Sequence, residues 1–183
     1  CVLAKKIDLK QFIYTSSVTV YGSNTKKKIN ERTLIKPDSI YGVSKYVGEM
    51  FINQELKNTK TKTTILRVFN TYGPGEDLNF LKKGMVSIYS SYVWRNKPII
   101  VKGSLDMIRA ITYIDDVVNL LYKTINHKKL EKNEVINLSS TNSLTIKQLI
   151  NEIIFASNKN NVKIVVTQCT DVDTKMIHSG HQD

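Results

Sequence analysis

The sequence predicts an α/β fold with a parallel sheet, because buried-strand patterns alternate with amphipathic helical patterns along the chain. Apolar and β-branched runs of strand length occur at 12–16, 63–68, 99–102, 135–138 and 162–166. Apolar residues recur at helical spacing at 39–56, 84–95, 115–125 and 144–156. A hydrophobic content of 41% is typical of a globular chain with a core.

Signals at the helix ends support this order of elements. Pro37 lies just before the first predicted helix, which follows the strand at 12–16. Asp115 can cap the third helix, whose apolar stripe contains Val117, Val118, Leu120 and Leu121. Either Ser143 or Thr145 can cap the fourth helix, whose inward-pointing residues are Leu149, Ile150, Ile153 and Ile154.

The composition excludes several classes of protein. A chain of 183 residues fits one domain or parts of two, and no apolar run reaches the roughly 18 residues that a membrane span needs. Cys1 and Cys169 form no CxxC pair, so neither a zinc site nor a disulfide framework is predicted. His178 and His181 lack a third ligand nearby, and we predict no metal site. A reducing, cytoplasmic setting is the expectation.

The net charge of +11 raises the question of nucleic-acid binding. The basic residues are 23 Lys and only 4 Arg, and they are scattered along the chain. No stacking aromatic residue interleaves with the run Lys26-Lys27-Lys28. We therefore predict no nucleic-acid partner, although a positive potential would favour an anionic substrate.

Tyr41 and Lys45 lie four positions apart and share one face of the predicted helix, with about 6 Å between their Cβ atoms. A free tyrosine has a pKa of about 10, but nearby positive charges, such as an ammonium and a cationic nicotinamide, favour the phenolate. Such a phenolate could take a proton from a sugar hydroxyl while hydride leaves the same carbon. Ser17 follows the strand at 12–16, at the sheet edge where α/β folds bind ligands, and could orient the reacting oxygen.

Chance is the alternative explanation for this pair. With 9 Tyr and 23 Lys in the chain, about one such spacing is expected at random, and it would mark a solvated helix face. The context favours function, because the pair follows a strand that ends in Thr15-Ser16-Ser17 and precedes a strand that leads to Phe69-Asn70.

A glycine-rich turn that could seat a dinucleotide pyrophosphate is absent from the sequence. The nearest candidate, residues 72–77, lacks a third glycine and contains Pro74 and two carboxylates that would repel a phosphate. The chain also begins at Cys1 and leads at once into a buried-strand pattern. We therefore expect residue 1 not to be the natural start, and the cofactor-binding front half to be missing.

Four segments, in the same order along the chain, resemble a known family; they are residues 12–22, Tyr41-x-x-x-Lys45, residues 66–75 and residues 109–117. Over about residues 1 to 173 the chain resembles the extended short-chain dehydrogenases/reductases. Within these it is most similar to the NAD-dependent epimerase/dehydratase family, and especially to its UDP-glucose 4-epimerases. The resemblance implies a partial Rossmann-like, doubly wound parallel sheet with a smaller C-terminal nucleotide-sugar-binding domain. The implied domains are 1–78 and 79–183, with 110–140 returning to the sheet.

The resemblance also implies roles for individual residues. Ser17, Tyr41 and Lys45 would be catalytic, and Lys45 would also hold the nicotinamide ribose of NAD. Contacts with the cofactor are implied for Ser16, Tyr41, Lys45, Val68 and Phe69. Contacts with a nucleotide sugar are implied for Ser17, Asn70, Gly84, Met85, Lys102, Arg109 and Asp171. A surface ion pair for Arg109, a tail carboxylate for Asp171 and core packing for Met85 remain alternatives.

The chain departs from the family pattern at four positions. Relatives that eliminate or decarboxylate place an acidic residue just after the catalytic serine, where this chain has Val18 and Thr19. Neither side chain is an acid or base at neutral pH, which disfavours a 4,6-dehydratase. Gln168 and Ala110 replace residues that the family uses around its substrate, and they weaken the expected grip on it.

The sequence thus predicts a nucleotide-sugar 4-epimerase, or a fragment of one, that uses NAD and most readily a UDP-sugar. A homodimer formed through the helix that carries Tyr41 is implied by the resemblance. A nucleotide-sugar reductase or dehydratase of the same family is the alternative within enzymes. A non-catalytic remnant that binds a nucleotide sugar is the alternative outside them.

Overall fold

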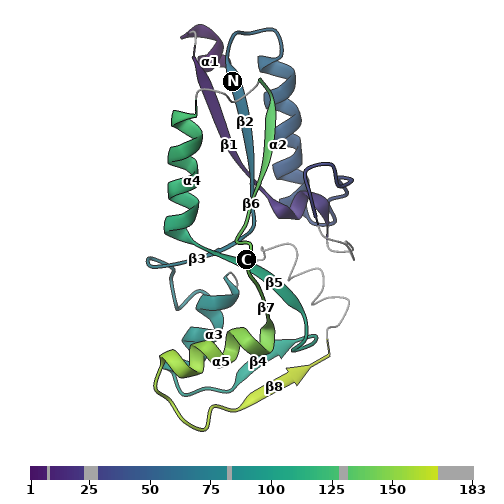
Figure 1. Ribbon diagram of the computed structural model, residues 1–183. Coiled ribbons are helices and arrows are strands. Elements are labelled where there is room, and N and C mark those ends of the chain that lie inside the picture. Colours follow the sequence, from purple (N-terminus) through teal and green to yellow (C-terminus); the bar gives the residue numbers. More distant parts are fainter. Residues whose placement is uncertain (8, 23–28, 82–83, 128–131, 169–183) are drawn as a thin grey trace. The chain divides into compact units, whose positions relative to one another are not determined.

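The computed structural model describes residues 1–7, 9–22, 29–81, 84–127 and 132–168 (Figure 1). These residues form two compact units. The first unit comprises Cys1–Phe69 and Asp115–Leu138, and the second comprises Asn70–Ile114 and Ser139–Asp183. The chain therefore passes from one unit to the other just after β2 (Lys62–Val68), at the start of α4 (Ile114–Asn126) and directly after β6 (Glu134–Leu138).

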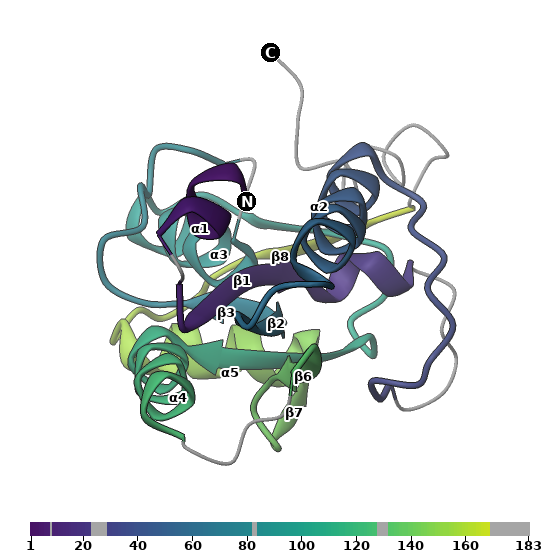
Figure 2. The same ribbon diagram turned by 90° about the horizontal axis from the view of Figure 1, so that it is seen from above.

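The first unit is a parallel sheet with helices on both faces. Its strands are β1 (Gln11–Ser17), β2 (Lys62–Val68) and β6 (Glu134–Leu138), in the order β1-β2-β6. Figures 1 and 2 show α2 (Ile40–Leu56) on one face of this sheet and α4 (Ile114–Asn126) on the other. The unit also contains the short helix α1 (Val2–Lys6) and the 3₁₀ turn η1 (Val18–Tyr21).

The strand register of the first unit brings three carboxyl ends to one edge of the sheet. Ser17 at the end of β1 pairs with Val68 of β2, and Val68 pairs with Leu138 of β6. This edge is where parallel α/β sheets bind their ligands. On the α2 side, Phe12 and Tyr14 pack against a buried cluster that contains Ala4, Ile52 and Leu56.

The second unit contains two small sheets. One is formed by β3 (Asn70–Tyr72), β5 (Ile108–Tyr113) and β7 (Ser143–Thr145), and the other by β4 (Ile99–Lys102) and β8 (Ile164–Thr167). Its helices are α3 (Met85–Trp94) and α5 (Ile146–Ala156). Its buried core is made of residues from these helices and from β4, namely Tyr89, Val93, Ile99, Val101, Ile146, Leu149 and Ile150.

The helix predicted at 144–156 is confirmed, although it begins at Ile146. Of the two predicted caps, Thr145 is the residue that caps it. The Thr145 hydroxyl accepts the Gln148 backbone N–H, and the Gln148 side chain accepts the Thr145 N–H, which completes a capping box. Ser143 belongs instead to β7. The predicted cap at Asp115 is wrong, because α4 begins at Ile114 and Asp115 lies in its first turn, where a carboxylate still complements the helix dipole.

The predicted apolar stripe of α4 is only partly correct. Val117 is buried and Leu121 is half-buried, but Val118 and Leu120 are exposed. The buried flank of α4 contains Val117 and Thr124, and the Thr124 carbonyl oxygen accepts a hydrogen bond from the Gln11 side chain of β1. Among the described residues, no helix is long and apolar enough to cross a membrane.

Candidate functional site

Ser17 ends β1 and also caps the turn that follows it. Its Oγ accepts hydrogen bonds from the Thr19 backbone N–H at 3.3 Å and from the Thr19 hydroxyl at 3.0 Å. The bond from the Thr19 N–H uses a lone pair of the serine oxygen, whereas in the bond between the two hydroxyls either group can donate. The Ser17 hydroxyl is thus held in place by η1 at the end of β1.

Helix α2 packs closely on η1 because its first turn contains a glycine. The Ser39 hydroxyl caps α2 by accepting the Gly42 N–H at 3.0 Å. A Cβ added at Gly42 would lie 2.6 Å from the Thr19 carbonyl oxygen, closer than real Cβ contacts. The absence of a side chain therefore lets the start of α2, which carries Tyr41, approach the turn that Ser17 caps.

Tyr41 and Lys45 meet on one face of α2, as their spacing predicts. The Lys45 Nζ lies 5.6 Å from the centre of the Tyr41 ring and 5.3 Å from the centre of the Tyr14 ring, within cation–π range of both. It also donates a 2.9 Å hydrogen bond to the Thr15 carbonyl oxygen of β1. Tyr41 is 38% exposed, so its ring is accessible to a ligand.

Tyr14 was not among the predicted site residues. Burial raises its pKa, and the charges of Glu49 and Tyr41 raise it further, so this hydroxyl stays protonated at neutral pH. Its hydroxyl would lie only 2.4 Å from a Cβ at position 48, which shows how closely Gly48 lets α2 approach β1. The signal in the sequence was the glycine one turn after Lys45.

The remaining predicted cofactor contacts of the first unit lie at the same sheet edge. Val68 is the Cα partner of Ser17, and the Phe69 N–H donates to the Leu138 carbonyl oxygen at 3.0 Å. Ser16 is buried and its hydroxyl donates to the Glu49 carboxylate at 2.5 Å, so that hydroxyl is already engaged. The structure therefore brings the predicted catalytic and cofactor residues of the first unit together, while their contacts with a cofactor stay predictions.

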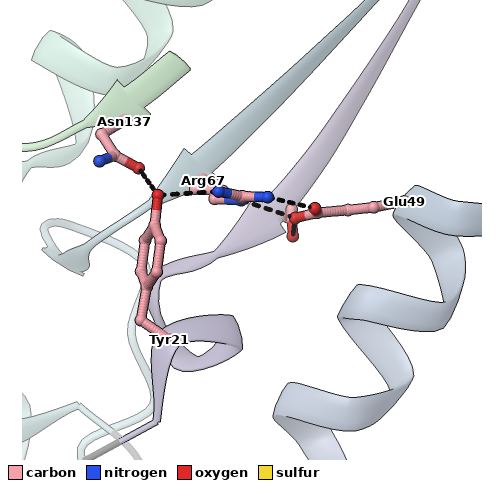
Figure 3. A network of polar contacts seen from close by, with 5 residues as sticks. Tyr21, Glu49, Arg67 and Asn137 are labelled. Atoms are coloured by element: carbon pink, nitrogen blue, oxygen red, sulfur yellow. Dashed lines mark hydrogen bonds and ion pairs between the residues drawn. The ribbon is translucent and has the colours of Figure 1, made fainter. Parts of the chain in front are cut away.

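The Glu49 partner of Ser16 belongs to a buried ion pair that the sequence analysis did not predict (Figure 3). The Arg67 guanidinium forms a two-pronged contact with Glu49, and both side chains are almost fully buried. Burial alone would lower the pKa of Arg67, but the hydrogen bonds and charge of Glu49, with help from Tyr21, raise it overall. The available signal was an arginine within the apolar strand pattern at 63–68.

The predicted substrate contacts of the second unit lie on separate elements. Asn70 begins β3 and its side-chain amide donates to the Ala110 carbonyl oxygen at 3.2 Å. Arg109 lies in β5, where its guanidinium donates to the Ile108 carbonyl oxygen at 2.9 Å. Lys102 ends β4, and its side chain is exposed. Their predicted contacts with a nucleotide sugar stay predictions.

The start of α3 contains two further predicted contacts. Gly84 precedes the helix with a φ of 74°, a left-handed conformation that favours glycine. Met85 packs against the core of the second unit, as the alternative explanation for this residue proposes. Asp171 lies outside the described residues, as do His178 and His181. Within the described ranges, no group of three His, Cys, Asp or Glu residues could hold a metal ion.

The second unit contains a pocket of about 410 Å³ that the sequence reasoning missed. It is lined by residues of the 72–78 loop, α3 and the end of β5, namely Tyr72, Gly73, Pro74, Gly75, Glu76, Leu78, Val86, Ser87, Ser90 and Tyr113. The Tyr72 and Tyr113 rings are tilted against each other with centres 5.5 Å apart. None of the predicted substrate residues is among this lining.

The fold and the Ser17, Tyr41 and Lys45 arrangement define a Rossmann-like α/β protein, and comparisons with known proteins agree. The model of the NAD dependent epimerase/dehydratase family matches residues 1–139. The chain is 30% identical over 151 residues to the dTDP-4-dehydro-6-deoxyglucose reductase of Escherichia coli, which covers 82% of this chain and 46% of that protein. It is 29% identical over 152 residues to a putative UDP-glucose 4-epimerase of Methanocaldococcus jannaschii, covering 82% and 48%.

A solved structure shows the same similarity. The UDP-glucuronic acid 4-epimerase of Bacillus cereus, in complex with UDP-glucuronic acid and NAD, matches with a TM-score of 0.80 at 28% identity. The match covers 90% of this chain and 51% of that chain. The chain belongs to the NAD dependent epimerase/dehydratase family, and the predicted Rossmann-like α/β fold is confirmed. The chain spans about half the length of the curated relatives it matches.

Proposed function

We propose that this chain contains the catalytic residues of an NAD-dependent nucleotide-sugar 4-epimerase, with a UDP-sugar as substrate. The observation that carries the proposal is the geometry at the carboxyl edge of the first sheet. An exposed Tyr41 lies beside the Lys45 ammonium, which is bound to the Thr15 carbonyl oxygen of the strand that ends in Ser17. Family membership supports the assignment of this arrangement to sugar oxidation and reduction.

The chemistry of these residues suits a reversible oxidation at one sugar carbon. Tyr41 accepts the proton of the 4-hydroxyl, and the Ser17 hydroxyl donates a hydrogen bond to the same oxygen. When bound, NAD supplies the hydride acceptor for that carbon. Tyr41 then returns the proton after the 4-keto sugar has turned over and been reduced on its other face. The result is inversion at C4 without net oxidation.

The described residues fit the nicotinamide end of NAD. An ammonium has three N–H donors, and Lys45 uses one on the Thr15 carbonyl oxygen, which leaves donors for ribose hydroxyls. Within the described residues no glycine-rich turn joins a first strand to a helix in the manner that seats a pyrophosphate. The pyrophosphate would therefore need donors beyond those that this sheet edge offers.

A nucleotide-sugar reductase is the second candidate, because the Escherichia coli relative at 30% identity is a reductase. A dehydratase is less favoured. The residues after Ser17 are Val18 and Thr19, and the Thr19 hydroxyl is bound to Ser17, so neither supplies the acid that elimination needs. A non-catalytic nucleotide-sugar-binding protein is the candidate outside enzymes.

Product analysis distinguishes these candidates. The whole protein that carries this chain is incubated with UDP-glucose and NAD⁺, and the nucleotide sugars are separated by chromatography. An epimerase yields a mixture of UDP-glucose and UDP-galactose with no consumption of NAD⁺. A 4-keto-6-deoxy sugar would identify a dehydratase, and oxidation of NAD(P)H with a 4-keto substrate would identify a reductase. Binding of UDP-glucose without any product would favour the non-catalytic alternative.

We also propose a homodimer formed through α2. Besides Tyr41, five large apolar side chains are exposed on this helix, namely Ile40, Val43, Val47, Met50 and Phe51. They lie away from the face that packs on β1, and an exposed apolar stripe of this kind is typical of a protein interface. On the basis of the proposed activity, we also propose a cytoplasmic location and a part in polysaccharide biosynthesis.

A further inference from the structure

Polar side chains from β1, η1, α2, β2 and β6 form one connected network inside the first unit (Figure 3). The Arg67 Nε and Nη2 atoms donate to the two oxygens of Glu49 at 3.0 and 2.7 Å, and Nη1 donates to the Tyr21 hydroxyl at 2.8 Å. Tyr21 donates in turn to the Asn137 side-chain oxygen at 2.8 Å. The Ser16 hydroxyl donates to Glu49 at 2.5 Å, which connects the end of β1 to the network.

Stability alone is a poor explanation for this arrangement. The side chains of Glu49 and Arg67 are only 3% and 4% exposed, so both charges have lost their hydration. Replacing such a pair by apolar residues of similar volume is often neutral or stabilising, because desolvation offsets the Coulomb attraction. What a connected buried network does provide is a defined geometry between the elements that contribute to it.

Three members of the network, Ser16, Glu49 and Arg67, lie close to residues of the proposed active site on the same strand or helix. Ser16 precedes Ser17, and Arg67 precedes Val68, the strand partner of Ser17. Glu49 lies one helical turn beyond Lys45 and two turns beyond Tyr41 on α2. The Ser16–Glu49 hydrogen bond therefore joins the strand that ends in Ser17 to the helix that carries Tyr41.

We propose that the Ser16–Glu49–Arg67 network positions Ser17 relative to Tyr41 and Lys45. The inference rests on the proposed function, and it makes Ser16, Glu49 and Arg67 positioning residues that act through the groups that touch the substrate. Successive side chains of a strand point to opposite faces. Tying Ser16 to α2 thus fixes the direction in which the next residue, Ser17, presents its hydroxyl.

Ser16→Ala is the most selective test, because it removes the connection to β1 and leaves both prongs of the Glu49–Arg67 contact intact. No buried charge loses its partner. Thr63→Val is the matched control: Thr63 is also fully buried in the same sheet, and its hydroxyl donates to the Asn133 side chain at 2.5 Å, near the opposite end of β2. Both variants lose one buried hydroxyl hydrogen bond, but only Ser16 lies beside the site.

In the whole protein, we expect Ser16→Ala to lower kcat about tenfold with little change in KM for the nucleotide sugar, since misplacement of reacting groups acts on the transition state. Thr63→Val should keep the kcat of the wild type. The double variant Ser16→Ala/Glu49→Gln should lose little more kcat than Glu49→Gln alone, because both changes break the same connection. Unchanged kcat in Ser16→Ala, fully additive losses, or a loss confined to NAD⁺ affinity would overturn the proposal.

A second readout needs no substrate and separates this proposal from the proposed function. Hydrogen exchange of the Ser17 backbone amide should be faster in Ser16→Ala than in the wild type by about tenfold, and unchanged in Thr63→Val. If the whole protein turns over no nucleotide sugar, the proposed function fails and the exchange rates still decide the positioning role. Equal Ser17 exchange in the wild type and Ser16→Ala would overturn it.

Discussion

Tyr41 and Tyr46 lie on the same helix and form a matched pair for testing the proposed base. Tyr41 is in the first turn of α2 beside the Lys45 ammonium, whereas Tyr46 is half-buried one turn later. Tyr41→Phe should lower turnover by about 10²–10⁴-fold, because the proton acceptor is lost while the ring and its packing remain. Tyr46→Phe should stay close to the wild type. Steady-state kinetics with UDP-glucose measure both, and near-normal turnover by Tyr41→Phe would refute the role of this residue.

Two neighbouring threonines of β2 allow a second prediction, which concerns the free energy of unfolding. Thr63 and Thr64 are both fully buried, but only Thr63 has a hydrogen-bond partner; the Thr64 hydroxyl has none among the described residues. A buried hydroxyl without a partner is destabilising, so Thr64→Val should raise the free energy of unfolding by about 1 kcal/mol. Thr63→Val should lower it by a similar amount. The midpoints of urea unfolding test this, and equal shifts of the same sign would contradict it.

The residues that could be predicted are those that carry recognisable chemistry. Ser17, Tyr41 and Lys45 were found because a tyrosine and a lysine four apart in a helix necessarily share a face, and because the serine follows a strand. The Glu49–Arg67 pair could not be found in this way. Its partners are 18 positions apart and meet only because α2 packs on the sheet in one particular register.

At the scale of an element, the start of α2 is the part that positions the site most directly. Alanine is the better helix former by about 1 kcal/mol, yet a Cβ at position 42 would lie 2.6 Å from the Thr19 carbonyl oxygen. That oxygen belongs to the backbone and cannot rotate away, so α2 or η1 must move. Gly42→Ala should therefore destabilise the protein by about 1–3 kcal/mol and lower turnover.

Gln54→Ala is the control for this change, because Gln54 is exposed on the same helix. It should leave both stability and turnover near the wild type. Thermal unfolding and steady-state kinetics measure the two effects. A Gly42→Ala variant as stable as Gln54→Ala would show that α2 tolerates a wider separation from η1.

Sequence patterns predicted the four long helices and most of the strands well. Strands β1, β2, β4 and β6 and helices α2, α3, α4 and α5 lie within two residues of their predicted bounds. Strands β3, β5 and β7 were not predicted. Strands β3 and β7 have three residues each, and in β5 the apolar residues are interrupted by Arg109 and Thr112, so periodicity alone could not separate them from loops. Strand β8 begins at Ile164, two residues later than predicted, and its pairing with β4 sets that start.

At the scale of the whole molecule, the proposed roles divide between the two units. The predicted cofactor contacts all lie in the first unit, and the predicted substrate contacts other than Ser17, where the structure describes them, lie in the second. The structure divides the chain after Phe69, Ile114 and Leu138, whereas the sequence suggested a domain boundary at residue 78 with a return at 110–140. The functional labels of these domains stay predictions, because sequence patterns show where elements end and do not show what a domain binds.

The central claim, inversion at C4 through a transient 4-keto sugar, is tested most directly with UDP-glucose that carries deuterium at C4. The hydride removed from C4 never exchanges with water in this mechanism, because Tyr41 and Ser17 handle only the hydroxyl proton. We expect the whole protein to form UDP-galactose that retains deuterium at C4, as read by mass spectrometry and NMR. UDP-galactose with hydrogen from solvent at C4 would contradict the account.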